Sequence, residues 1–216
     1  MTASAAPATP ATERRYRGRS GEERRADRRE RLLDAGLDLF GTQGYPGTSI
    51  ESLCAVAGIS TRNFYEEFRN REALLIALHD FANATAMDSV TRALAAADPA
   101  DAAARATAAA QAFVDAMTPD PRWSRIAYIE IVGISPDMEA RRRAWMERWA
   151  QVIAAEGAQL SARGLAPDRD FALTAVGLVG AINELVADWL FRASRPPIDA
   201  VVAEIVRLLV AGLSAP

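Results

Sequence analysis

Apolar residues recur every three or four positions along most of this chain, which is the spacing of amphipathic helices rather than strands. The clearest case is the segment Thr48–Leu75, TSIESLCAVAGISTRNFYEEFRNREALL, where Gly58 separates two short periodic stretches. Each stretch has one apolar face, formed by Ile50, Leu53, Cys54 and Ala57 before the glycine and by Phe64 and Phe68 after it. The pattern predicts two short helices joined by a turn, with another helix starting at Asn70.

The residues at the ends of these stretches are typical helix caps. Thr48 has Glu51 three residues later, which is the capping-box spacing, and Ser60 suits the N-cap of the second helix. Gly58 suits a left-handed turn, which costs glycine no Cβ clash. Two short helices around a glycine turn form a helix-turn-helix, whose second helix enters the DNA major groove.

The rest of the chain also favours helix, so we predict an all-α fold of about nine helices. In the apolar run Trp123–Ile134 the period alone does not separate helix from strand, and the helical context decides for helix. Proline- and glycine-containing breaks bound most of the other segments. Besides the two short helices, the predicted helices are Asp27–Thr42, Asn70–Ala97, Asp101–Thr118, Trp123–Ile134, Ser135–Arg163, Asp168–Ala193 and Ile198–Leu213.

The N-terminal part is rich in arginine. Residues 1–12 are low-complexity, and Glu13–Arg31 holds nine Arg against five acidic residues. This run is either a solvated helix start with i,i+4 charge pairs or a basic arm that reaches DNA, and Gly18 and Gly21 favour the arm for its first part. We predict a disordered Arg-rich arm over 1–26, the helix-turn-helix domain over 27–69, and a second helical domain over 70–216.

Composition limits the function classes. The net charge is −3, divided as +1 over residues 1–75 (12 Arg, 11 acidic) and −4 over 76–216 (13 Arg, 17 acidic), so non-specific DNA affinity should be modest. All 25 basic residues are Arg. A single cysteine, the lack of about 18 uninterrupted apolar residues and the lack of a signal-peptide pattern predict a soluble cytoplasmic protein, nucleoid-associated when DNA-bound.

Helical geometry assigns roles within the second short helix. With Phe64 and Phe68 pointing inward, the polar residues near its N-terminus point outward, where such helices meet base edges. Arg62 suits guanine O6 and N7, and Asn63 suits adenine or a phosphate. Cys54 lies on the inner stripe and is read as a core residue, and His79, without ligand partners at metal spacing, as a partly exposed helix residue.

The segment Arg29–Leu75 closely resembles the DNA-binding domain of TetR-family (TetR/AcrR type) transcriptional regulators, with landmarks such as Leu39-Phe40, Gly44-Tyr45 and Ala57-Gly58-Ile59-Ser60. The resemblance implies phosphate contacts by Tyr65 and Thr48, and by Arg71 where most members have lysine. Glu67 departs from the family pattern and should face solvent or pair with arginine. The predicted DNA-binding residues are Thr48, Ser49, Ser60, Thr61, Arg62, Asn63, Tyr65 and Arg71.

Two further surfaces are predicted in the remaining helices. The last two helices are apolar around more than one face, which favours a two-fold four-helix bundle over packing inside one subunit. Its predicted interface residues are Phe171, Leu178, Ile182, Trp189, Val202, Ile205 and Leu209. Aromatic and Met residues in the middle of the chain are either core or the lining of an effector pocket, for which the candidates are Phe81, Phe113, Met117, Trp123, Tyr128, Trp145, Trp149 and Asn183.

The helix-turn-helix indicates a DNA-binding regulator. The resemblance further implies that residues 70–216 form an effector-binding and dimerisation domain, and that the protein is a homodimeric repressor released from a palindromic operator by a small hydrophobic effector. The alternatives are a regulator without a small-molecule effector and a ligand-dependent activator. An enzyme is disfavoured, because the chain has no catalytic carboxylate–His or Cys–His set and no phosphate-binding glycine loop. No cofactor or metal is expected.

Overall fold

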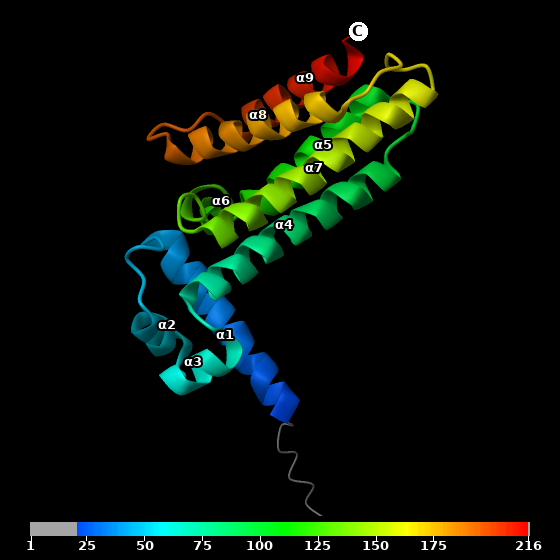
Figure 1. Cartoon of the computed structure of the whole chain (residues 1–216). Coiled ribbons are helices and arrows are strands. Elements are labelled where there is room, and N and C mark those ends of the chain that lie inside the picture. The colour runs from blue at the N-terminus through cyan, green and yellow to red at the C-terminus, as the bar shows by residue number, and fades with distance from the viewer. Residues whose placement is uncertain (1–20, 216) are drawn as a thin grey trace, which may run out of the picture.

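The computed structural model describes residues 21–215, and all the regular structure in that range is helical. At the N-terminal end α1 (Gly21–Thr42), α2 (Ile50–Ala57) and α3 (Thr61–Glu67) form a small head. The long helix α4 (Arg71–Ala96) leads from this head into the rest of the molecule (Figure 1). The predicted all-α fold is confirmed.

The larger part of the molecule is a helical bundle. Figure 1 shows α4 beside α5 (Ala102–Met117) and α7 (Pro136–Ala162), with α8 (Ala172–Phe191) and α9 (Ile198–Ser214) along their far side. Between α5 and α7 the chain forms the short α6 (Pro121–Arg125) and the π-helical segment η1 (Ile126–Glu130), close to the head.

Side-chain caps set most helix starts. Asn70 Oδ1 accepts a hydrogen bond from Ala73 N at 2.8 Å, and Ser135 Oγ accepts one from Met138 N at 3.1 Å. The predicted capping box of Thr48 and Glu51 is wrong by one residue. Ser49 is the N-cap of α2 and exchanges hydrogen bonds with Ser52, which serves the same free backbone N–H groups.

Three other boundaries differ from the prediction. Helix α1 begins at Gly21, so residues 21–26, predicted as part of a disordered arm, are helical; residues 1–20 lie outside the described range. The run Trp123–Ile134 is not one helix, because α6 passes into η1 and the chain then turns through Gly133 with a φ of +75°. Helix α8 begins at Ala172, four residues after the predicted start.

The molecule has two main apolar cores. One fills the bundle between α4, α5, α7, α8 and α9. The other lies inside the head, where it is completed by the first turns of α4 and by Ile126, Ile131 and Met138 from the bundle side. The head is therefore packed against η1 and the start of α7, and a rearrangement of η1 disturbs its core.

Candidate nucleic-acid interface and effector pocket

The recognition edge is the outer face of α3, which we define as Thr61, Arg62, Asn63 and Tyr65. Thr61, Arg62 and Tyr65 are exposed, and Asn63 is half-buried. The Arg62 side chain is 89% exposed and has only a loose ion pair with Glu66, at 3.5 Å, so it is free to turn toward a base. Ser60 caps this helix by accepting from Asn63 N at 3.2 Å.

The opposite face of α3 is anchored in the head core. Phe64 and Leu53 are fully buried, and Phe68 is nearly so. Gly58 has a φ of +63°, the left-handed conformation predicted for it, and turns α3 across α2. The arrangement that the sequence predicted, a polar outer edge held by an apolar underside, is present.

Two of the residues predicted to contact phosphate make hydrogen bonds inside the head. Thr48 is 1% exposed, and its hydroxyl donates to the carbonyl of Gly44 at 2.8 Å, so its side chain does not face outward. Arg71 donates to the carbonyls of Tyr45, at 3.1 Å, and Thr48, and its guanidinium lies 4.4 Å from the centre of the Tyr45 ring. Arg71 therefore holds the turn between α1 and α2 together.

Arginines of α1 support the recognition helix, a role that the sequence did not reveal. The side chain of Glu67 is 1% exposed and pairs with Arg28 at 3.1 Å and Arg25 at 3.2 Å, as the prediction of an arginine partner required. Arg31 donates to the carbonyl of Ala57 at 3.2 Å. These contacts neutralise the Glu67 charge close to the expected DNA surface.

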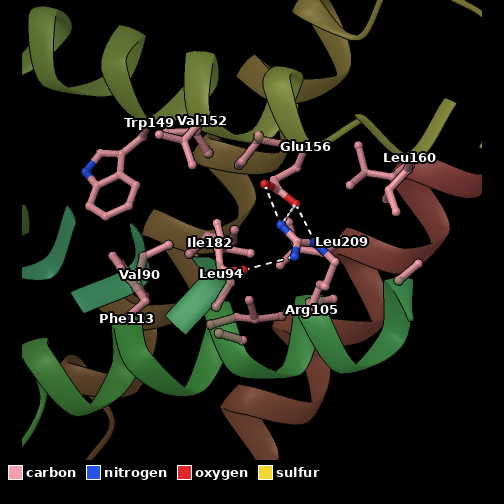
Figure 2. A pocket seen from close by; sticks show the side chains of 18 of the residues that line it. Val90, Leu94, Arg105, Phe113, Trp149, Val152, Glu156, Leu160, Ile182 and Leu209 are labelled. Atoms are coloured by element: carbon pink, nitrogen blue, oxygen red, sulfur yellow. Dashed lines mark hydrogen bonds and ion pairs between the residues drawn. The ribbon is translucent and has the colours of Figure 1, made fainter. Parts of the chain in front are cut away.

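A narrow apolar cavity of about 90 Å³, here called the apolar slot, lies inside the bundle between α4, α5, α7, α8 and α9 (Figure 2). Arg105, missed by the sequence analysis, lies in its wall and pairs with Glu156 at 2.8 Å. Arg105 also donates to the carbonyls of Leu94 and Ala97, so all its N–H groups have protein acceptors. The slot offers a ligand little besides apolar contact.

A second cavity of about 300 Å³, here called the polar chamber, lies between α4, η1, α7 and α8. Trp149 and Asn183 line both spaces, so the polar chamber and the apolar slot adjoin. Its wall also includes Tyr128, whose phenol pKa is raised by burial, and Trp145.

The predicted pocket residues divide between these cavities and the core. Phe113 lines the apolar slot, and Tyr128, Trp145, Trp149 and Asn183 line the polar chamber. Neither cavity is lined by Phe81, Met117 or Trp123. Met117 is buried in the bundle core, and the ring of exposed Phe81 packs against the ring of Trp123, with the ring centres 5.3 Å apart. His79, expected to be partly exposed, is 1% exposed and lines the polar chamber.

Most of the predicted dimer residues point into the subunit. Phe171 packs over Gly157 of α7, and Leu178 packs over Gly212 of α9. Ile182 and Trp189 are half-buried, and the remaining three residues are buried: Val202, Ile205 and Leu209. The uncovered apolar face of α8 is a stripe formed by Leu173, Val176, Gly177 and Phe191, with half-buried Gly180 beside it.

One carboxylate connects the bundle to the head. Glu130, the last residue of η1, accepts a hydrogen bond from the backbone N–H of Tyr45 at 2.7 Å. It also accepts one from Arg125 Nε at 2.7 Å, and its side chain is 6% exposed. Because Tyr128 on the same segment lines the polar chamber, η1 contacts both the chamber and the turn before α2.

These features define an all-α helix-turn-helix DNA-binding protein whose second domain contains internal cavities. The family model "Bacterial regulatory proteins, tetR family" matches residues 32–78. The uncharacterized HTH-type transcriptional regulator YerO of Bacillus subtilis (strain 168) is 31% identical over 55 residues, which are 26% of this chain and 19% of that protein's length. Residues 32–78, which form most of the head and the start of α4, therefore match the DNA-binding domain of the TetR family.

Solved structures show the same fold over nearly the whole chain. The regulator FadR of Bacillus subtilis, in complex with stearoyl-CoA, superposes with a TM-score of 0.76 at 16% identity, covering 85% of this chain and 98% of FadR. AibR, in complex with isovaleryl coenzyme A and operator DNA, gives a TM-score of 0.64 at 18% identity, covering 88% of this chain and 99% of AibR. At these identities the likeness establishes the fold alone.

Proposed function

We propose that this regulator is a cytoplasmic homodimer that represses a palindromic operator and is released by a small, largely hydrophobic effector. The recognition edge on α3 carries the proposal, because its polar residues are exposed while Phe64 and Phe68 fix the helix from behind. A two-fold dimer presents two such edges about 34–36 Å apart to successive major grooves. Ser49, Ser60 and Tyr65 are exposed around this edge and supply phosphate contacts.

The uncovered face of α8 supports dimerisation. By length and composition α8 is the one helix in the described range apolar enough to cross a membrane, yet only 22% of it is buried inside the subunit. Gly177 and Gly180 have no heavy atom within 4 Å of a Cβ built there, which leaves room for close approach of a second helix. A second copy of α8 packing on this stripe removes the apolar surface from water.

The effector acts from the two cavities. Complexes of FadR with stearoyl-CoA and of AibR with isovaleryl coenzyme A show ligand binding in proteins of this fold, which supports an effector here. A ligand that favours a different position of α4 or η1 shifts the spacing of the two heads. Helix α4 transmits the change because it enters the head directly, and η1 transmits it through the hydrogen bond between Glu130 and Tyr45. Complete release requires about 5.5 kcal/mol of differential affinity.

Selection from random DNA tests the proposal. Purified full-length protein should enrich a palindromic motif, and Arg62→Ala should relax the preference at one position per half-site by about 1–3 kcal/mol. Tyr65→Ala should weaken binding to all sequences alike, because a phosphate contact carries no base information. Enrichment of no palindrome by the wild-type protein would refute the proposed function.

A further inference from the structure

The polar chamber contains polar groups that no part of the described chain satisfies. The Nδ1 atom of His79 is buried without a hydrogen-bond partner and lies 3.9 Å from Asp80 Oδ1, beyond hydrogen-bond distance. The amide of Asn183 and the phenol of Tyr128, which line the same chamber, also have no hydrogen bond within residues 21–215. A buried polar atom without a partner costs about 1–3 kcal/mol, which a ligand that supplies the partner recovers.

The charged groups around the chamber, by contrast, are already paired. Arg142 donates twice to Glu139 at 2.8 Å, and Asp80 accepts from Arg141 Nε and from Trp145 Nε1, both at 2.7 Å. Glu184 is exposed at the rim, where water solvates it. Phenol and amide groups each donate and accept without carrying a charge, so the polar surface of the chamber suits an uncharged group.

The walls of the chamber suit a flat ring. Trp145 and Trp149 face it together with Tyr128, and both indole N–H groups are fixed by hydrogen bonds, Trp145 to Asp80 at 2.7 Å and Trp149 to Asn83 at 3.0 Å. The rings are therefore held in place before a ligand arrives, which reduces the entropy cost of binding. The Arg148 guanidinium lies over one face of the Trp145 ring, 4.6 Å from its centre, and aromatic rings in such a lining favour stacked or edge-on contact with another ring.

We infer that the effector is an uncharged aromatic compound with a hydrogen-bonding group, such as a phenol or an aryl amide or ketone. Its ring lies in the polar chamber against Trp145 and Trp149, its polar group meets His79 Nδ1 and the Asn183 amide, and an apolar substituent enters the adjoining slot. The regulatory role of this ligand rests on the proposed function. Its binding to the protein does not, because binding requires no DNA.

Calorimetric titration of the full-length protein with four naphthalene probes tests the inference. 2-Naphthol is uncharged at neutral pH, 2-naphthoate is an anion, 2-naphthylmethylammonium is a cation, and naphthalene has no polar group. We expect 2-naphthol to bind at least about tenfold more tightly than the other three, the effect of one satisfied buried polar group. Equal or tighter binding of the anion or the cation, or binding of none of the probes, would overturn the inference.

Variants locate the binding site. His79→Phe and Asn183→Leu should each reduce 2-naphthol affinity about tenfold and leave naphthalene affinity unchanged. His79→Asn, which places an amide near the Nδ1 position, should retain most of the affinity and so separates loss of the polar group from loss of folding. Gln159→Leu, on an exposed part of α7, is the matched control. Unchanged 2-naphthol affinity in folded His79→Phe, or binding of isovaleryl coenzyme A alone, contradicts the assignment.

The two proposals fail independently. Because the titrations contain no DNA, failure of all probes leaves operator selection intact, and the effector chemistry alone is then wrong. Failure of operator selection with normal 2-naphthol binding removes the regulatory function instead.

Discussion

At the scale of single residues, the position of the N-cap of α2 decides which of two neighbouring hydroxyl groups faces solvent. Thr48 and Ser49 are adjacent and both suit an N-cap, but the cap of α2 falls on Ser49, which turns Thr48 inward. Arg71 has the charge of a phosphate-binding residue, yet its planar guanidinium fits two backbone carbonyls of the preceding turn. The recognition edge was predictable because Phe64 and Phe68 fix which face of α3 is buried.

Asp80 makes the stability of the bundle depend on pH. Burial opposes ionisation of this carboxyl group, but the His79 imidazole 3.9 Å away and the hydrogen bonds from Arg141 and Trp145 outweigh that penalty and lower its pKa below the ordinary value. A lowered pKa in the folded protein adds stability above the unfolded-state pKa of about 3.9, and this contribution is lost as the pH falls toward the folded-state value.

We therefore expect Asp80→Asn to lower the free energy of unfolding by a constant amount between about pH 5 and pH 7, and by progressively less below about pH 4. Urea unfolding at a series of pH values measures this difference. Asp88→Asn, an exposed position on the same helix, is the control and should follow the wild type. A difference between wild type and Asp80→Asn that grows as the pH falls contradicts the assignment.

At the scale of elements, the helices with clear caps and one apolar face were predicted well, and the α6–η1 region was not. The predicted helix starts at Asn70, Asp101 and Ser135 coincide with the N-caps of α4, α5 and α7, so these helices begin within one residue of the prediction. The region of α6 and η1 differs because a five-residue π-helical turn has no apolar period to read. For α8 and α9, apolar residues on several faces left open which face meets α7.

The crossing of α1 and α6 depends on Gly41. A Cβ atom built there lies 2.5 Å from Arg122 Cβ and 3.1 Å from Arg122 Cα, so α6 must move to admit it. We expect Gly41→Ala to lower the melting temperature, because overpacking of about 1–3 kcal/mol exceeds the roughly 1 kcal/mol that alanine gains in helix propensity. Calorimetry measures the shift.

Gly21→Ala is the matched control for this substitution. Gly21 lies in the same helix with no heavy atom within 4 Å of a built Cβ, so its replacement should not lower the melting temperature. An unchanged melting temperature in Gly41→Ala would show that α6 moves away without cost.

At the scale of the whole molecule, two structural units share one head core. The fold class was predictable from helical periodicity. The contribution of Ile126, Ile131 and Met138 to the head core was not, because these residues follow Leu75 by more than 50 positions in the sequence. The boundary predicted after residue 69 therefore separates segments of sequence that are packed together in space.

Assembly should depend on the uncovered stripe of α8. Leu173 is 88% exposed in the single subunit, and replacing it with glutamate places a charge where the second copy of α8 is proposed to pack. We expect wild-type protein to be dimeric and Leu173→Glu to be monomeric in light scattering coupled to size-exclusion chromatography. Val132→Glu, at an exposed valine outside α8, should remain dimeric. A wild-type monomer, or a dimeric Leu173→Glu variant, contradicts this interface.

The single thiol of the protein has a further consequence. Cys54 is buried beneath the helix-turn-helix, and burial raises its pKa. A chromogenic disulfide reagent reaches such a sulfur only when the head transiently opens, and the protonated form reacts slowly once it is reached. The rate of colour development therefore measures how often the head opens, and no label has to be attached to the protein. Operator binding should slow it.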